Sequence, residues 1–205
     1  MAQLIQEPVK LEVILVTAPG VSLILPDTPL PVRMVTAGGS NRGGLLNAGA
    51  AIAQGGILLF VWPGNQLPFE ALLTIEKNLS LLPQTIGGNF HLKFEADTVL
   101  SRLIARFIAR QRYMGRYYGN SGIFVRADVF KSLGGFAPLD LLEDYDFGLR
   151  LEASGPTLYL PDKIIAPVEK FGLKAALAWT AIILSQKLGV PLPKLETIAK
   201  TLGWK

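Results

Sequence analysis

The 205-residue chain contains no cysteine and a single histidine, His91. The absence of cysteine excludes a disulfide framework, thiolate metal ligands and a cysteine nucleophile. One histidine is too few for a multi-histidine zinc site within one chain. Charged residues are also sparse, at 18% of the chain against 50% hydrophobic residues. This composition argues against disorder and predicts a folded domain with a substantial core.

Long apolar runs and targeting signals are missing as well. The first 13 residues lack a basic segment followed by an apolar one, so no signal peptide is predicted. The apolar segment 175–186 is shorter than the roughly 20 residues that a membrane-spanning helix needs. We therefore expect a cytoplasmic protein. The apolar helix 173–188 is expected either to pack against the domain's own core or to contact a membrane surface or a partner.

The basic residues are concentrated in one predicted helix. The net charge is +4, and the densest basic cluster consists of Arg102, Arg106, Arg110, Arg112 and Arg116. One apolar face of the same helix is marked by Leu100, Leu103, Ile104, Phe107 and Ile108. The arginines form either an ordinary solvated face or a surface for phosphates or anionic lipid. No recognised nucleic-acid-binding motif accompanies them, so no nucleic-acid partner is expected.

Short apolar runs alternate with helical patterns along the chain. Strands are predicted at 11–16, 32–37, 56–62, 90–94 and 157–161, with helices between most of them. Such alternation is typical of an α/β fold, here a three-layer sandwich around a mainly parallel, mixed sheet. We expect a single domain over residues 1–205 that ends in a helical segment, 171–205.

Four stretches of the chain resemble family 2 glycosyltransferases of the GT-A type. They are SNRGGLLNAGAAIAQGGILLF (40–60), IGGNFHLKF (86–94), YGNSGIFVRADVFKSLGGF (118–136) and LLEDYDFGLRL (141–151). The ordered set is most similar to a bacterial subgroup of arsenosugar-biosynthesis-associated glycosyltransferases. The resemblance implies the fold of nucleotide-diphospho-sugar transferases and a nucleotide or nucleotide sugar as partner.

The resemblance also implies roles for particular residues. Arg42 and Asn47 match family residues near the nucleotide base and ribose, at a glycine-rich helix start whose free N–H groups suit an anion. Glu143 and Asp144 match a catalytic acidic pair in which the Asp is the general base for the acceptor hydroxyl. Two plainer interpretations stay open, since acidic residues favour the first turn of any helix and Asn47 suits a solvated helix surface.

At three positions of the expected site, the chain lacks the acidic residue that the family carries. Thr17 stands where the family has an Asp that contacts the base, and Gly64, followed by Asn65, stands at the metal-binding Asp. On the acceptor side, Asn120 takes the place of another Asp. Mg²⁺ and Mn²⁺ prefer carboxylate oxygens, and losing comparable electrostatic stabilisation costs about 3–4 kcal/mol. We therefore expect no metal ligands and no cofactor.

Three functions follow from this pattern. The first is a nucleotide-sugar-binding domain that lacks canonical metal-dependent transfer. The second is an active inverting glycosyltransferase that uses Asp144 as base with an atypical donor. The third is a non-catalytic module for a protein or membrane surface. The family usually has a further strand–helix unit before the strand at 11–16. We expect that strand to take the first strand's place, or the sheet to close over the gap.

Overall fold

The computed structural model describes residues 10–201, except 23, 25–26, 40, 168–184 and 186–189. Strands and helices alternate along most of this length, as the sequence predicts. In chain order they are β1 (Val13–Thr17), β2 (Val32–Thr36), α1 (Arg42–Ile52), β3 (Ile57–Phe60), α2 (Ala71–Leu81), β4 (Gly87–Phe94), α3 (Val99–Arg112), the 3-10 turn η1 (Gly119–Ser121), β5 (Ile123–Arg126), α4 (Ala127–Ser132), α5 (Glu143–Ser154), β6 (Thr157–Ala166) and α7 (Leu192–Thr201).

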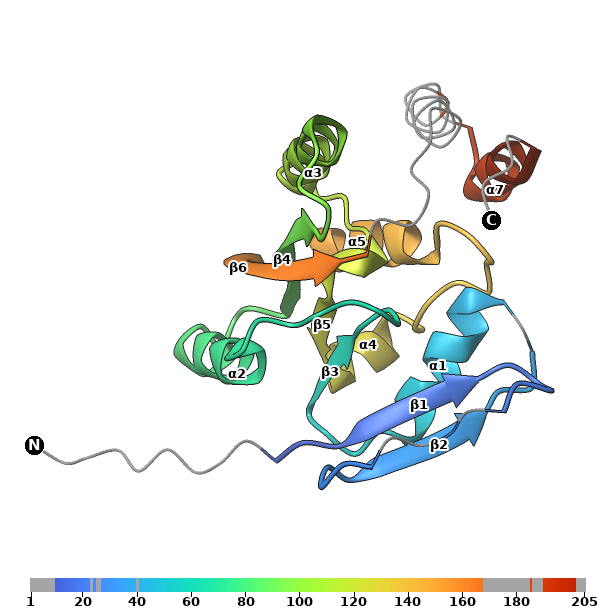
Figure 1. The fold of residues 1–205 in the computed structure, drawn as a ribbon, viewed down its shortest axis with the longest axis vertical. Helices are drawn as coiled ribbons and strands as arrows, with labels where there is room; N and C mark the ends of the chain where they lie inside the picture. Colours follow the sequence, from blue (N-terminus) through green and yellow to red (C-terminus); the bar gives the residue numbers. More distant parts are fainter. Residues whose placement is uncertain are drawn as a thin grey trace, which may run out of the picture.

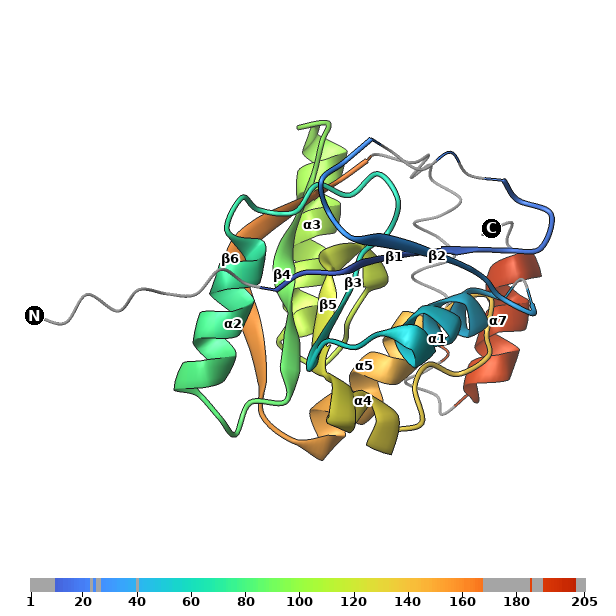
Figure 2. The same ribbon diagram turned by 90° about the horizontal axis from the view of Figure 1, so that it is seen from below.

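The described strands form two hydrogen-bonded sheets (Figures 1 and 2). In the first, β1 and β2 run parallel. The second has the order β3-β5-β4-β6; β4 and β6 run parallel, while β5 is antiparallel to both of its neighbours. Strands joined through helices into sheets of mixed direction confirm the predicted α/β class.

One buried cluster lies on each face of the four-stranded sheet. Successive residues of β5 point to opposite faces, as the strand period requires. Phe124 packs with residues of α2 and β4, whereas Ile123 and Val125 pack with α4 and α5. All three are at most 1% exposed. Burial on both faces explains why this strand is a continuous apolar run rather than an alternating one.

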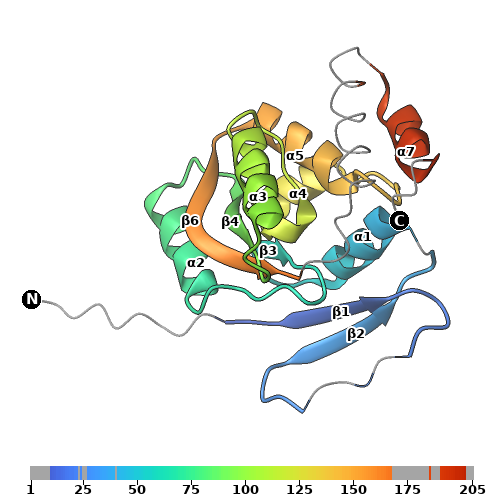
Figure 3. The same ribbon diagram turned by 45° about the horizontal axis from the view of Figure 1, so that its top comes forward.

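The β1–β2 pair is less buried than its apolar sequence predicts. Val13 to Val16 are only half-buried, although such an apolar run is typical of a strand covered on both faces. Helix α1 covers one face, and it approaches closely because residue 49 is glycine: a Cβ there would lie 2.8 Å from Cγ2 of Val16. Figure 3 shows α1 between this pair and the rest of the fold.

The β1–β2 pair does not join the four-stranded sheet, so the described strands do not close into one sheet. Among the described strands, β1 pairs with β2 alone and β3 with β5 alone, so β1 and β3 share no hydrogen bonds. Side-chain hydrogen bonds attach the β1–β2 pair to the rest of the fold instead. Glu12 accepts hydrogen bonds from the N–H groups of Gln54 (2.6 Å) and Gly55 (2.9 Å), and Arg33 donates to the carbonyl of Ile52 (2.7 Å). These contacts tie β1 and β2 to the end of α1.

The C-terminal helix α7 joins the main core. Leu195 is fully buried in the cluster that contains β4 and α2, and the ammonium of Lys200 lies 2.8 Å from the carboxylate of Asp140. None of the helices in the described part of the chain is both long and apolar enough to span a bilayer. The predicted apolar helix 173–188 lies outside the described residues except for Ser185.

Arg112 differs from the other predicted arginines of α3, because its side chain is buried rather than exposed to solvent. Its Nε donates to Oδ1 of Asn89 (2.5 Å), and Nη2 donates to Oγ1 of Thr157 (2.9 Å) and the carbonyl of Leu158 (3.1 Å). Nη1 lies 3.1 Å from the carboxylate of Glu152. This network joins the end of α3 to β4, α5 and β6, so Arg112 holds the fold together instead of meeting a ligand.

We predict that Arg112→Leu strongly destabilises the fold. The substitution removes the partner of Oδ1 of Asn89 and the cation beside Glu152, and leaving a buried polar group unsatisfied costs about 1–3 kcal/mol in the free energy of unfolding, more for a charged group. Urea denaturation measures the change. The matched control is Arg110→Leu on the exposed side of the same helix, expected to stay within about 0.5 kcal/mol of the parent. Equal stability of the two variants would contradict the structural role of Arg112.

Candidate functional site

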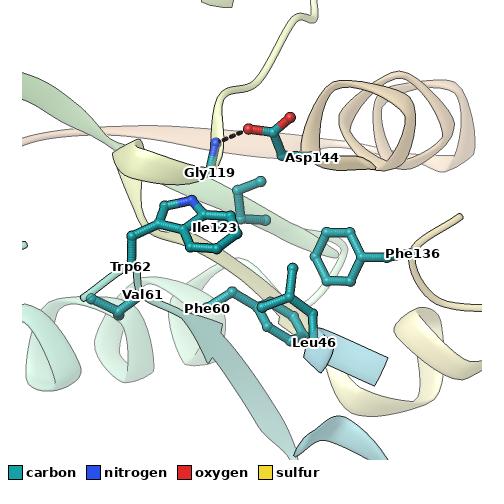
Figure 4. A pocket seen from close by; sticks show the side chains of 8 residues that line it. All are labelled: Leu46, Phe60, Val61, Trp62, Gly119, Ile123, Phe136 and Asp144. Atoms are coloured by element: carbon teal, nitrogen blue, oxygen red, sulfur yellow. Dashed lines mark hydrogen bonds between the residues drawn. The ribbon is translucent and has the colours of Figure 1, made fainter. Parts of the chain in front are cut away.

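A small hollow lies beyond the end of β3, between η1 and the start of α5 (Figure 4). Its cavity volume is about 10 Å³, room for about one water molecule. Most of its wall is apolar or aromatic. The lining residues are Leu46, Phe60, Val61, Trp62, Gly119, Ile123, Phe136 and Asp144. Asp144 is the one charged side chain among these lining residues.

Asp144 is the acidic group of this hollow. One oxygen of its carboxylate accepts a hydrogen bond from the N–H of Gly119, and the other accepts from the N–H of Tyr145 (2.7 Å). The helix that carries Asp144 begins after Leu142, whose φ of 67° lies in the left-handed region that branched side chains rarely adopt. Strained backbone of this kind is concentrated at functional sites. Here it sets the direction in which α5 leaves the loop.

The surroundings of Asp144 raise the pKa of its carboxyl group above the usual value. Burial is the main cause, because it disfavours the charged form. The hydrogen bond from Gly119, the positive charge of Arg42 and the hydrogen bond from Tyr145 act in the opposite direction without cancelling it. A carboxylate with a raised pKa is a stronger base, which suits it to remove a proton from a hydroxyl group near neutral pH.

Trp62 closes one side of the hollow. The guanidinium carbon of Arg42 lies 3.9 Å from the centre of its ring, a cation–π contact. The edge of the indole is pressed against Gly119, where a Cβ would come within 2.1 Å of Nε1. The Nε of Arg42 also lies 3.3 Å from the carboxylate of Glu143, which is fully buried. Of the predicted acidic pair, Asp144 therefore lines the hollow, while Glu143 holds Arg42.

The turn after β3 lies against the loop that carries Asn120. The N–H of Asn65 donates to the carbonyl of Trp62 (3.1 Å), and Gly64 has a φ of 85°. Proline at 63 and glycine at 64 are the residues that a type II turn requires. The side-chain amide of Asn65 donates to the carbonyl of Asn120 (2.8 Å). Oδ1 of Asn120 is buried and has no hydrogen-bond partner within the described structure.

The structure does not bring Thr17 or Asn47 to the hollow. Thr17 is buried at the end of β1, where its hydroxyl lies 3.3 Å from that of Thr36. The side chain of Asn47 donates to the carbonyl of Phe136 (2.8 Å) and accepts from its N–H (2.9 Å). Asn47 is thus neither solvated nor turned toward a ligand. It fixes the loop that carries the Phe136 ring.

The glycine-rich start of α1 serves packing rather than anion binding. The N–H of Gly43 donates to the carbonyl of Leu139 (3.1 Å), and that of Gly44 donates to Oδ1 of Asn41 (2.7 Å), so two of the N–H groups expected to be free are taken. A Cβ at position 43 would lie 1.9 Å from the carbonyl oxygen of Ala137. Glycine is required here because another backbone segment passes at contact distance.

Trp62, Gly119 and Phe136 are site residues that sequence reasoning did not single out. A signal was present for Trp62, since it follows the clearest strand directly and precedes a Pro-Gly turn. The ends of strands at one edge of a sheet are where α/β proteins place ligands. For Gly119 and Phe136 no local pattern marks the position, because their neighbours in the site come from other elements.

The residues present do not fit a protein-bound divalent metal. No group of three or more His, Cys, Asp or Glu side chains that could hold a metal occurs among the described residues. The turn after β3 presents Gly64 and Asn65, which carry no carboxylate, and both oxygens of Asp144 already accept backbone hydrogen bonds. Mg²⁺ and Mn²⁺ prefer carboxylate oxygens, so we derive no step through a metal.

Comparisons with known proteins find a similarity in structure but none in sequence. No protein-family model matches the chain, and no curated protein sequence is significantly similar to it. Among solved structures, the fold is similar to that of the mannosyltransferase PcManGT from Pyrobaculum calidifontis in complex with GDP-Man and Mn²⁺. The TM-score is 0.53 at 16% sequence identity. The fold is of the GT-A type.

The similarity covers 84% of this chain and 52% of the mannosyltransferase, so the chain spans about half the length of that protein. At this level of identity the GT-A-like architecture is shared, whereas the site has to be argued from its own residues. The expected glycosyltransferase-like fold is thereby confirmed. Membership of family 2, and of its arsenosugar subgroup, stays a prediction.

We predict that Gly119→Ala disturbs the site directly. Its new methyl group would overlap the edge of the Trp62 indole, and overpacking of this kind costs about 1–3 kcal/mol in the free energy of unfolding. Urea denaturation measures the loss. Gly56→Ala is the matched control, because a Cβ at position 56 meets no atom within 4 Å. Equal stability of the two variants would contradict the close contact between Trp62 and Gly119.

Proposed function

We propose that this chain is a nucleotide-sugar-binding domain of the GT-A type that does not depend on a protein-bound metal. The observation that carries the proposal is the hollow at Asp144, whose lining residue Trp62 begins a turn that has no carboxylate at Gly64 and Asn65. The mannosyltransferase of similar fold holds GDP-Man and Mn²⁺. We infer a ligand of the same class here, bound without the cation.

Arg42 is the group that takes over part of the metal's electrostatic role in this proposal. A nucleotide diphosphate is strongly anionic, and a guanidinium can donate two hydrogen bonds to one phosphate. The Arg42 side chain is 39% exposed and is held between the Trp62 ring and Glu143. The remaining exposed part of the guanidinium is available to a phosphate at the mouth of the hollow.

The ring of Trp62 offers a second element of recognition. Sugars and bases stack on aromatic faces, and this ring is already fixed by Arg42 above it and Gly119 at its edge. The hollow itself, at about 10 Å³, is far smaller than the roughly 300–1,000 Å³ of typical ligand sites. Binding of a whole nucleotide sugar therefore requires that the ligand extend beyond the hollow, along the turn at residues 62–65.

Isothermal titration with GDP-mannose, UDP-glucose and ADP-glucose tests the proposal. We expect the dissociation constant of the preferred ligand to be the same in Mn²⁺ and in EDTA. Arg42→Ala should weaken binding by about tenfold or more, the worth of a hydrogen bond between charged groups. Arg102→Ala, on the far exposed side of α3, is the control and should bind like the parent. Failure to bind any of the three ligands, or strict dependence on Mn²⁺, would refute the proposal.

A second candidate is an active inverting glycosyltransferase with Asp144 as its base. It is favoured by the raised pKa of Asp144 and by the place of this carboxylate in the wall of the hollow. In this candidate, Asp144 takes the proton from the acceptor hydroxyl. The base would then act on the side of the donor opposite the leaving nucleotide, as inversion requires.

This candidate predicts that Asp144→Asn abolishes turnover while the fold is retained. Removing a general base lowers the rate by about 10²–10⁴-fold. In the parent, activity is lost as the pH falls, because protonated Asp144 is no longer a base. The midpoint of this loss lies above the pKa of an ordinary aspartate, since the pKa of Asp144 is raised. Release of nucleoside diphosphate measures both effects. Asp128→Asn, exposed at the start of α4, is the control. Unchanged turnover in Asp144→Asn would exclude Asp144 as the base.

A further inference from the structure

Helix α3 carries apolar side chains that the core does not use. Of the five residues on its predicted apolar face, Ile108 is buried and Ile104 is partly buried. The other three are exposed, Leu100 by 51%, Leu103 by 54% and Phe107 by 39%. The predicted face is therefore wider than the surface that packs on the sheet. Its outer part lies open in the described structure.

The exposed side of α3 has an apolar stripe and a basic stripe next to each other. Leu100, Leu103 and Phe107 follow one line along the helix at a spacing of three and four residues. Arg102, Arg106 and Arg110 follow the adjacent line at a spacing of four. The opposite side is buried through Ser101, Ile108, Gln111 and Arg112. We call the six exposed residues of the two stripes the α3 face.

The arginines of the α3 face are largely free to meet a negatively charged partner. Arg102 lies 3.6 Å from Asp97, with both side chains more than half exposed, and such a pair contributes little. Arg106 and Arg110 form no ion pair with any described residue and point into solvent. By contrast, Arg116 donates to Oε1 of Gln111 (2.6 Å) and does not belong to the face.

The helix is well anchored, so the α3 face is a defined surface. A reciprocal capping box between Thr98 and Ser101 fixes its first turn. The buried Arg112 network fixes its last turn. Figure 1 places α3 at the end of the molecule opposite β1 and β2. Tyr113, which is 81% exposed, and Met114, at 49%, continue the surface beyond the helix.

We infer that the α3 face binds an anionic lipid surface, with the helix lying in the plane of the membrane. The apolar stripe would enter the boundary between headgroups and acyl chains, and the arginines would pair with lipid phosphates beside it. Charge complementarity selects this partner, because Arg106 and Arg110 without ion pairs, and Arg102 in a weak exposed pair, lie beside the apolar stripe and need an anionic surface that also accepts hydrocarbon. Nucleic acid would satisfy the arginines but leave Leu103 and Phe107 in water. The inference does not depend on the proposed function.

Flotation with phosphatidylcholine vesicles, with and without phosphatidylglycerol, tests this inference. We expect the full chain to bind the anionic vesicles on the order of a hundredfold more tightly than the neutral ones, as three arginines near an anionic surface imply. The double substitution Arg106→Gln with Arg110→Gln should lose most of that preference. Lys77→Gln with Lys131→Gln removes the same charge from exposed sites on α2 and α4 and should bind like the parent.

The apolar stripe is tested by Leu103→Ser with Phe107→Ser, which should still give a cooperative unfolding transition, at somewhat lower stability because Phe107 is only 39% exposed. We expect this variant to bind anionic vesicles at least tenfold more weakly. Three results would overturn the inference. They are no binding by the parent, equal binding by either α3 variant, and binding of a duplex oligonucleotide or self-association through the α3 face in place of vesicle binding.

Discussion

The hydrogen bond from the N–H of Gly119 to the carboxylate of Asp144 brings three parts of the chain to one point. It ties η1 to the first turn of α5, and the indole of Trp62 packs against the same glycine. A side chain at 119 would separate all three. The hollow, the raised pKa of Asp144 and the position of the Arg42 guanidinium over Trp62 therefore depend on one residue without a Cβ.

The charge balance of the site follows from this arrangement. Glu143 is buried beside Arg42, and Asp144 is held by backbone N–H groups. Both carboxylates thus have partners within the chain, and the described residues contain no group of three or more potential metal ligands. The positive group of the site is an arginine side chain. A GT-A-like fold is thus combined with electrostatics that favour an anionic ligand over a cation.

Much of the fold could be predicted from local patterns. Short apolar runs located β1, β2 and β3, and the Pro-Gly pair after β3 marked a turn that carries no metal-binding Asp. The acidic start of α5 pointed to Asp144. The roles of Gly43 and Asn47 could not be found in this way. Asn47 hydrogen-bonds to Phe136, 89 residues away, and Gly43 is required by the backbone of the 137–139 loop.

The sequence by itself determined which segments form strands and helices, and which positions lack a carboxylate. Both are properties of neighbouring residues, since the periods of strand and helix extend over only a few positions. The tertiary structure decided that Arg112 is buried while Arg106 is exposed, and that β1 and β3 stay apart. In the sequence the two arginines look alike. Their difference arises because burial depends on which side of the helix meets the sheet, and that sheet is assembled from strands far apart in the chain.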